Sequence, residues 1–330
     1  MWELDKEKLE IKKILDESNI ILLTMSSPDG DSIGSSLALK FILEQLGKTV
    51  EIVCSFDLAG RFNNYIGSSS IIISDLGRVD FNRYDCCFTL DAGHISRLVR
   101  SEFYPNGFKF PKSLKVINID HHQSNDLFGT LNINVKEASC TAEVLETLFE
   151  GEYMMDSTIG KLLFYSVVYD TVNFRHNVTA HMMEFALKCL KSGINAEEVI
   201  SEFFNNRSLI QTKYEGVLLE RMIHKDNYVC TFAYHDDIEK YGIDVAKYLS
   251  ATATIARDYI SAFKDADFGW VISERRSNVV KLEMRGKIED TPILEITQSL
   301  GGGGHKKACG AKIIDKSIEE VQDYIIKYLS

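Results

Sequence analysis

The residues of this sequence with the clearest chemical potential are Asp120, His121 and His122. They follow the mostly apolar run 115–119, which predicts a buried β-strand. In open α/β sheets, ligands bind at the carboxyl ends of the strands. A strand that ends in a carboxylate and two imidazoles therefore indicates a metal site. The alternative is that the two histidines lie on an exposed loop without a role, and these three residues alone do not decide between the two.

Further carboxylates follow apolar runs elsewhere in the chain. They are Asp29 and Asp31 after the run 20–23, Asp91 after 86–90 and Asp170 after 162–169. Each of them alone is compatible with an ordinary helix cap or turn residue. In a doubly wound sheet, however, the strand ends meet at one edge, so we expect these side chains to converge there.

Converging carboxylates repel one another unless they share cations. Oxygen ligands with some imidazole nitrogen suit Mn²⁺ better than Mg²⁺, Co²⁺ or Zn²⁺. Two ions would fit such a set, with Asp91 as a natural bridge. A two-metal site generates a water nucleophile and stabilises charge on a phosphoryl group. The residues thus predict hydrolysis of a phosphate ester.

The elements that position these residues alternate between strands and helices. Strand-like runs lie at 20–23, 49–54, 71–74, 86–90 and 115–119, and helical patterns lie at 3–18, 32–46, 141–150 and 157–169. This alternation predicts an α/β domain with a doubly wound, mostly parallel sheet.

The pattern changes after residue 179. It is helical over 179–204 and 210–222, and then strand-like at 228–234, 268–274 and 279–285, with helices at 245–256 and 318–329. We therefore predict a catalytic domain at 1–185, a helical connector at 186–222 and a smaller mixed α+β domain at 223–330.

The second domain contains a candidate anion site. Four glycines, Gly301–Gly304, precede His305, Lys306 and Lys307. Glycines let backbone N–H groups approach an anion closely. Arg285 ends the strand-like run 279–285, and its planar guanidinium suits a phosphate. A tight turn without a ligand and an ordinary surface arginine are the alternatives.

Composition excludes several classes of protein. The 330 residues are 45% hydrophobic, and no apolar run approaches the length of a membrane span. The net charge of −11 argues against a broad grip on long nucleic acid. Residues 1–8 lack the features of a signal peptide, and the seven scattered cysteines form no zinc or disulfide pattern. We therefore expect a cytoplasmic protein without membrane contact.

The motifs together resemble a known family. They are Pro28-Asp29-Gly30-Asp31-Ser32-Ile33-Gly34-Ser35, Asp91 with Arg97, Asp120-His121-His122, Ala138-Ser139-Cys140-Thr141-Ala142-Glu143, Asp170-Thr171-Val172-Asn173-Phe174-Arg175 and Gly301–His305. In order and spacing the chain resembles the DHH phosphoesterase family with a DHH-associated C-terminal domain, of the oligoribonuclease (nano-RNase)/pAp-phosphatase type.

The resemblance implies roles for the residues of the first domain. It implies that Asp29 binds one Mn²⁺ ion, that Asp31 and His121 bind the other, that Asp91 bridges them and that Asp170 completes the shell. Asp91, Asp120 and His122 would be the catalytic residues. In this family pattern His122 meets the scissile phosphate and Asp120 supports the histidines.

The resemblance also implies a substrate. Arg285, Gly303, Gly304 and His305 would grip the terminal phosphate or base of a short nucleotide. The family cuts di- to tetranucleotides of RNA into mononucleotides and converts pAp to AMP, with a water activated by two metal ions. The resemblance also implies that the protein can form a homodimer. Linear dinucleotides such as pApA and pGpG are alternative substrates that the sequence does not separate from these.

One position departs from the family pattern. A histidine that binds the first metal usually stands three residues before Pro28, and here that residue is Met25. A thioether is a poor ligand for Mn²⁺, so the first metal site would be weakened. The chain could then be a nucleotide-binding protein with little turnover. A further hypothesis is that His94, near Asp91, partly replaces the missing imidazole, and the alternative is a loop histidine without a role.

Overall fold

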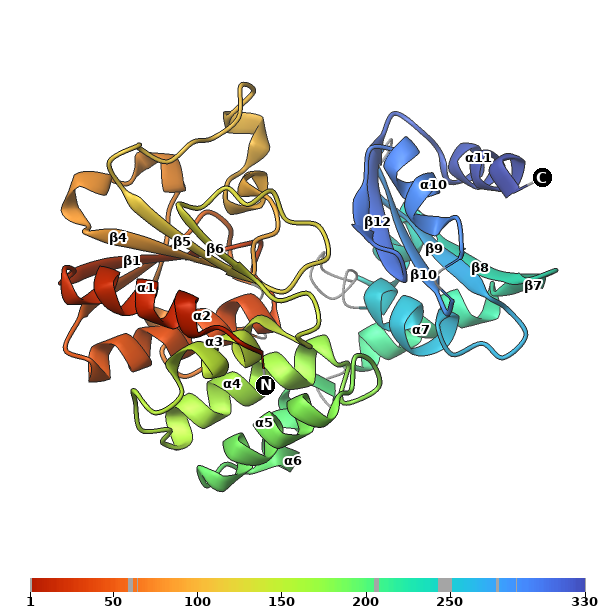
Figure 1. Cartoon of the computed structure of the whole chain (residues 1–330). Coiled ribbons are helices and arrows are strands. Elements are labelled where there is room, and N and C mark those ends of the chain that lie inside the picture. The colour runs from red at the N-terminus through yellow and green to blue at the C-terminus, as the bar shows by residue number, and fades with distance from the viewer. Residues whose placement is uncertain are drawn as a thin grey trace. The chain divides into compact units, whose positions relative to one another are not determined.

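The computed structural model describes residues 2–58, 62–63, 65–204, 208–242, 251–276, 279–288 and 290–329. The chain divides into two compact units, residues 1–206 and 207–330 (Figure 1). Of the helix predicted at 245–256, residues 245–250 lie outside the described residues, 251–255 are helical, and a π-helical turn follows at Ala256–Ile260. The predicted connector at 186–222 stays a prediction.

The first unit is built on a six-stranded sheet in the order β3-β2-β1-β4-β5-β6. Its strands are β1 (Ile20–Met25), β2 (Thr49–Cys54), β3 (Ile71–Ile73), β4 (Cys86–Leu90), β5 (Lys115–Asp120) and β6 (Leu131–Asn134). Every pairing between neighbours is parallel. The central strands are buried almost throughout, because both faces of the sheet are covered. The predicted parallel α/β fold is confirmed.

Helices lie on one side of this sheet, in more than one layer (Figure 1). They are α1 (Asp5–Asp16), α2 (Gly30–Gln45), α3 (Thr141–Phe149), α4 (Ser157–Asp170), α5 (Ala180–Lys191) and α6 (Ala196–Phe204). Their apolar side chains form one core with those of β1, β2, β4 and β5, and alternate residues of the strands, such as Leu22 and Cys87, face a second core. That core is closed by residues between Leu76 and Phe110, where short 3-10 helices replace α-helices.

The second unit has a mixed sheet in the order β11-β12-β10-β9-β8-β7. Its strands are β7 (Ile223–Lys225), β8 (Tyr228–Ala233), β9 (Phe268–Arg276), β10 (Val279–Gly286), β11 (Gly303–His305) and β12 (Ala308–Ile314). Only β8 and β9 pair in parallel. The helices are α7 (Leu209–Glu220), α8 (His235–Tyr241), α10 (Ile293–Ser299) and α11 (Ile318–Leu329). The predicted mixed α+β character is confirmed.

Each face of the second sheet has its own apolar core. Trp270, Leu282 and Met284 pack with residues of α10 and α11, whereas Val229 and Val271 pack with α7 and residues 251–260. Among the described residues of both units, no helix combines the length and the apolar character that a membrane span requires.

Candidate metal centre

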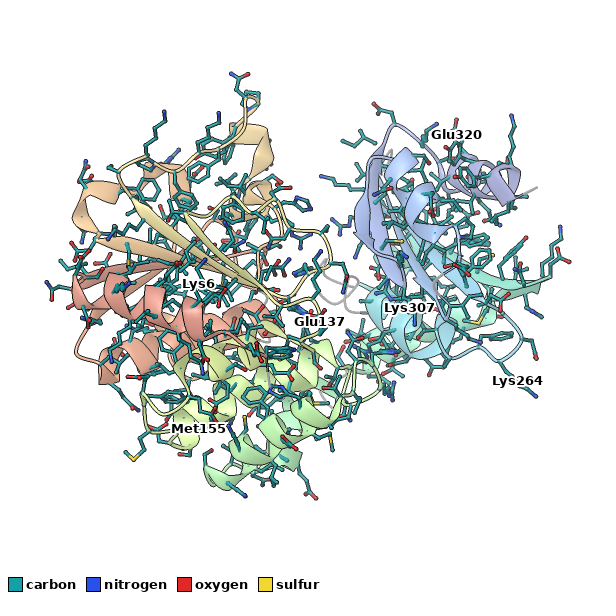
Figure 2. The ribbon with its side chains drawn as sticks, viewed as in Figure 1. Lys6, Glu137, Met155, Lys264, Lys307 and Glu320 are labelled. Carbon is teal, nitrogen blue, oxygen red and sulfur yellow. The ribbon has the colours of Figure 1, made fainter. Side chains whose placement is uncertain are left out.

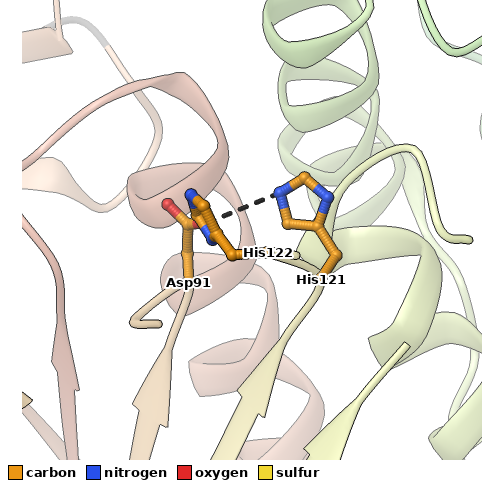
Figure 3. A group of neighbouring side chains, drawn as sticks. All are labelled: Asp91, His121 and His122. Atoms are coloured by element: carbon orange, nitrogen blue, oxygen red, sulfur yellow. Dashed lines mark ion pairs between the residues drawn. The ribbon is translucent and has the colours of Figure 1, made fainter. Parts of the chain in front are cut away.

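Asp91 lies at the centre of the candidate site, directly after β4. Its backbone is left-handed, with φ of 56°, a conformation that aspartate tolerates better than most residues. Only 3% of the residue is exposed. Its Oδ1 atom lies 3.7 Å from His121 Nε2 and 3.4 Å from His122 Nδ1 (Figure 3). The ends of the neighbouring strands β4 and β5 thus bring a carboxylate and two imidazoles together, as predicted.

His121 is the point on which three carboxylates converge. Its Nε2 atom lies 3.0 Å from Asp170 Oδ2 and 3.7 Å from oxygens of both Asp31 and Asp91. Its Nδ1 atom lies 3.3 Å from the carbonyl oxygen of Ala138. A carbonyl only accepts, so Nδ1 carries a proton, and Nε2 is the ring atom that faces the carboxylates and would bind a metal once its own proton is displaced. This is the arrangement of a metal-binding imidazole.

Asp29 and Asp31 belong to the start of α2, where they bond with backbone amides. Asp29 caps the helix, since its Oδ1 accepts hydrogen bonds from the amides of Asp31 and Ser32 at 3.0 and 2.9 Å. Asp31 is fully buried, and its two oxygens accept from the amides of Thr141 and Ala142 at 2.7 and 3.4 Å. The N-terminus of α3 therefore holds Asp31 in place, with its partial positive charge beside the carboxylate.

Asp170 comes from the last residue of helix α4 and not from a strand end. Two glycines of α2 allow α4 to come close enough. A Cβ on Gly34 would lie 2.7 Å from the carbonyl oxygen of Leu162, and a Cβ on Gly30 would lie 2.3 Å from the ring of Tyr169. The close packing of α2 on α4 thus delivers the Asp170 carboxylate to the edge of the sheet.

The concentration of negative charge changes the pKa values of the site. Burial, reinforced by the charges of the neighbouring aspartates, raises the pKa of Asp91 well above its usual range. Burial and the Asp31 charge raise the pKa of Asp170 to about 7, although His121 opposes this. Burial alone would lower the pKa of His121, but its hydrogen bond to Asp170 and the surrounding carboxylates raise it to about 10. These carboxylates need a compensating cation.

The donors present fit a divalent cation. Among the described residues, two groups of three side chains bring ligand atoms within 4.8 Å of one another, Asp31–His121–Asp170 and Asp91–His121–His122. In the second group, Nδ1 of His122 donates to Asp120, so the ring could bind a metal only through Nε2. The carboxylates of Asp31, Asp91 and Asp170 approach Nε2 of His121, and such oxygen ligands with one imidazole nitrogen suit Mn²⁺. Asp29 belongs to neither group of the described residues, and its role as a ligand stays a prediction.

His122 is oriented by a buried carboxylate. Its Nδ1 atom lies 2.7 Å from Asp120 Oδ1, and the other oxygen of Asp120 accepts a 2.7 Å hydrogen bond from Asn125 Nδ2. Asp120 is fully buried. Burial favours its neutral form, but the hydrogen bond and charge of His122 lower its pKa, so the carboxylate stays ionised. The family resemblance implies that Asp120 supports the histidines, and beyond this contact with His122 that role stays a prediction.

Some residues of the site had no assigned role in the sequence. Thr141 donates its amide to Asp31, and its hydroxyl lies 3.4 Å from Asp91 Oδ1. Ser26 Oγ lies 3.4 Å from Asp91 Oδ2. Asn125 was missed because it lies in a loop without a pattern. The signal for Thr141 was its place at the start of a predicted helix, where free amides bind anions.

Met25 and His94 lie in different surroundings. Met25 ends β1 opposite Leu90, and it is fully buried in the apolar core of the first unit. His94 is part exposed, and its Nδ1 atom lies 2.6 Å from Asp126 Oδ1. Within the described residues, His94 belongs to neither group of candidate ligands. The structure gives no support to the idea that His94 replaces the missing imidazole.

The predicted substrate residues of the second unit lie on adjacent strands. Arg285 of β10 and His305 of β11 both pair with Ala308 of β12, so they occupy one row of the sheet. The side chain of His305 lies outside the described residues. Gly304 has φ of +139°, and a Cβ there would lie 2.6 Å from the carbonyl oxygen of Ala308, so only glycine fits. Gly303 has open space around it.

The guanidinium of Arg285 contacts its two preceding residues on β10. Its guanidinium donates a 2.9 Å hydrogen bond to the carbonyl oxygen of Met284, and NH2 lies 3.8 Å from Glu283 Oε2. Of the glycine run, Gly303 and Gly304 belong to the edge strand β11, which contributes His305 to the row that contains Arg285. That this row binds substrate stays a prediction.

Comparisons with known proteins identify relatives over almost the whole chain. The family model described as the DHH family, N-terminal domain, matches residues 19–169. The bifunctional oligoribonuclease and PAP phosphatase NrnA of Thermus thermophilus is 26% identical, with 99% of this chain and 93% of that protein covered. The protein of the same name from Bacillus subtilis is 22% identical, with 89% of each chain covered.

A solved structure shares the fold of both units. The exopolyphosphatase-related protein from Bacteroides fragilis matches with a TM-score of 0.84 and 19% identity, covering 99% of this chain and 97% of that one. RecJ from Thermus thermophilus in complex with Mn²⁺ matches with a TM-score of 0.51 and 13% identity, covering 98% of this chain and 54% of that one. Residues 19–169 thus match the N-terminal domain of the DHH family, and the chain is similar over most of its length to relatives named as oligoribonucleases and PAP phosphatases.

Proposed function

We propose that this protein is a metal-dependent phosphoesterase that hydrolyses short oligoribonucleotides to mononucleotides and pAp to AMP. The observation that carries the proposal is the convergence of Asp31, Asp91 and Asp170 on Nε2 of His121. The relatives named as oligoribonucleases and PAP phosphatases support the substrate class, because their similarity extends over most of the chain.

We propose Mn²⁺ as the ion and two ions as the full complement. Asp31, Asp91, His121 and Asp170 would hold one ion, and Asp29 would hold the second with Asp91 as the bridge. The hard oxygen ligands and single imidazole nitrogen support this choice of ion. When bound, the ions would lower the pKa of a water nucleophile and offset charge on the phosphate.

The chain's own residues orient the substrate. The hydrogen bond from His122 Nδ1 to Asp120 orients the imidazole ring, and a hydrogen bond from Asn125 holds the Asp120 carboxylate in place. We propose that His122 contacts the scissile phosphate. Thr141 and Ala142 keep Asp31 in place through their amides, which leaves the carboxylate in position before the reaction begins.

We propose that Arg285, Gly303, Gly304 and His305 of the second unit bind the substrate. One support is that Arg285 and His305 both pair with Ala308 and so lie in one row across the sheet. The other is the planar, positively charged guanidinium of Arg285, which suits a terminal phosphate. A cytoplasmic location is supported by seven free cysteines, all of them buried. The homodimer rests on the family resemblance alone.

The test is hydrolysis with purified protein and Mn²⁺. The substrates are pAp, pApA and a ladder of RNA dimers to pentamers, and the matched proteins are wild type, Asp91→Ala and Asp126→Ala. Asp126 is a suitable control because it pairs with the part-exposed His94. We expect turnover of pAp and the shortest RNAs by wild type and Asp126→Ala, and loss of turnover in Asp91→Ala. A wild-type rate no higher than that of Asp91→Ala on every substrate would refute the proposal, and exclusive turnover of pApA would shift it to linear dinucleotides.

A further inference from the structure

The segment Ala138–Ala142 contacts three of the residues proposed to hold the metal. The carbonyl oxygen of Ala138 lies 3.3 Å from His121 Nδ1, and the amide of Thr141 donates to Asp31 at 2.7 Å. The hydroxyl of Thr141 lies 3.4 Å from Asp91 Oδ1. The segment directly follows Glu137, which Figure 2 labels in the first unit. A small displacement of this segment would therefore move several candidate ligands at once.

A buried carboxylate holds this segment from behind. Glu143 is fully buried, and its Oε2 accepts a 2.7 Å hydrogen bond from the amide of Ser139, inside the segment. Its Oε1 lies 2.5 Å from His181 Nδ1 on helix α5. A buried carboxylate is costly unless both oxygens have partners, and here one partner is the segment and the other is an imidazole.

His181 is fixed in turn by an aromatic neighbour. Its ring lies 4.4 Å from the ring of Trp2, measured between centroids, at an interplanar angle of 52°. The side chain of His181 is 27% exposed, whereas that of Glu143 is fully buried. The chain of contacts thus runs from Trp2 through His181 and Glu143 to Ser139.

We propose that Glu143 and His181 form a positioning pair that holds the segment Ala138–Ala142 in the geometry required for metal binding. This inference rests on the proposed function, because it takes Asp31, Asp91 and His121 as ligands. The competing explanation is that the pair only ties α3 to α5. A purely structural tie would change the stability of the fold without a selective change in metal affinity.

The chain offers a matched control for that explanation. Lys188, also on α5, lies 3.2 Å from Glu146 Oε1 and forms a second ion pair with Glu150, so it too joins α5 to the α3 region. Neither glutamate has a contact with the segment among the hydrogen bonds described for them. Lys188→Met therefore removes a tie between the same parts of the fold and leaves the segment untouched.

Two substitutions at His181 separate its contacts. His181→Phe keeps a ring against Trp2 but removes the N–H donor to Glu143. His181→Asn loses the ring but places an amide N–H near the position of Nδ1. Glu143→Asp keeps the charge and shortens the side chain, so that one carboxylate no longer reaches both partners. It serves as the second variant should His181→Phe fail to fold.

The experiment measures the dissociation constant for Mn²⁺ by titration calorimetry, with thermal unfolding of the metal-free proteins alongside. We expect His181→Phe and Glu143→Asp to bind Mn²⁺ about tenfold to a hundredfold more weakly than wild type, as is typical when a partner behind the ligands is lost. We expect His181→Asn to recover most of the affinity and Lys188→Met to keep the wild-type value at a lowered unfolding temperature.

Three outcomes would overturn the inference. A wild-type dissociation constant in folded His181→Phe and Glu143→Asp would exclude a positioning role. Equal weakening in Lys188→Met would show that any loosening of α5 has the same effect. No Mn²⁺ binding by the wild-type protein would overturn the proposed function and this inference with it, whereas the first two outcomes leave the proposed function standing.

Discussion

His121 Nε2 lies 3.0 Å from Asp170 Oδ2, although the two residues belong to different kinds of element. His121 follows strand β5, and Asp170 is the last residue of helix α4. The contact exists because α4 packs against α2 at two glycines, Gly30 and Gly34. The candidate metal site is therefore shared between the sheet edge and a helix end.

The same contact predicts a pH dependence of metal binding. In the metal-free protein the pKa of Asp170 is raised to about 7 and that of His121 to about 10, so the site holds a proton at neutral pH. An incoming ion must displace that proton, and acid therefore favours the metal-free state. We expect the Mn²⁺ affinity to rise between pH 6 and 9, by about tenfold per pH unit for each proton released. Titration calorimetry in buffers of different ionisation enthalpy measures the number of protons released on Mn²⁺ binding. A dissociation constant for Mn²⁺ that does not change with pH over this range would contradict the prediction.

Asp170→Asn should weaken Mn²⁺ binding by about tenfold or more, because an amide is a poorer ligand than a carboxylate for a hard cation. The loss of charge alone is controlled by Asp126→Asn, which removes an exposed carboxylate paired with His94. Titration calorimetry of both variants checks this. Equal affinities in Asp170→Asn and wild type would remove Asp170 from the site.

Asp120→Asn should lower kcat more than it lowers metal affinity. In the wild-type protein the two oxygens of Asp120 accept one hydrogen bond each, from His122 Nδ1 and from Asn125 Nδ2. The side-chain amide introduced at position 120 has only one oxygen, so it can accept only one of these two hydrogen bonds, and its NH₂ group faces the other donor. We expect kcat to fall by about tenfold to a hundredfold, as is typical when the partner that orients a site residue is lost. Steady-state kinetics on pAp at saturating Mn²⁺ measure it. A variant with unchanged kcat and raised KM would show that the pair serves substrate binding instead.

Met25→His should increase the affinity for Mn²⁺ and lower the stability of the metal-free protein. The side chain of Met25 is fully buried in an apolar core, where an unpaired polar ring costs about 1–3 kcal/mol. Met25→Leu is the matched control, because it keeps the core apolar and adds no ligand. Metal titration and thermal unfolding of the three proteins decide the matter. Identical titrations of Met25→His and wild type would show that this position has no part in metal binding.

Much of the first unit follows from its sequence. The runs 49–54 and 86–90 are strands with those bounds, since mostly apolar stretches of this length suit a sheet covered on both faces. Strand β6 was not predicted, because Asn132 and Asn134 interrupt its apolar pattern. In the second unit the glycine run is expected to bind an anion, with a tight turn without a ligand as the alternative, and the structure places Gly303 and Gly304 in strand β11.

The candidate site was predicted in part for a physical reason. The aspartates at strand ends converge because parallel strands share an edge, which is a property of the fold class. The approach of Asp170 depends on side-chain packing between α2 and α4, and the contact of Thr141 with Asp31 depends on where α3 begins. Neither is encoded in local periodicity.

Cys140 lies in the segment Ala138–Ala142, and the reactivity of its thiol can report when this segment opens. Its thiol is fully buried, and burial together with the charges of Asp31 and Asp170 raises its pKa well above the usual range. An alkylating reagent therefore reaches a reactive thiolate at this position only when the segment leaves the carboxylates. The rate at which Cys140 is alkylated, measured by mass spectrometry, would therefore depend on how often the segment opens. We expect Mn²⁺ to lower this labelling rate.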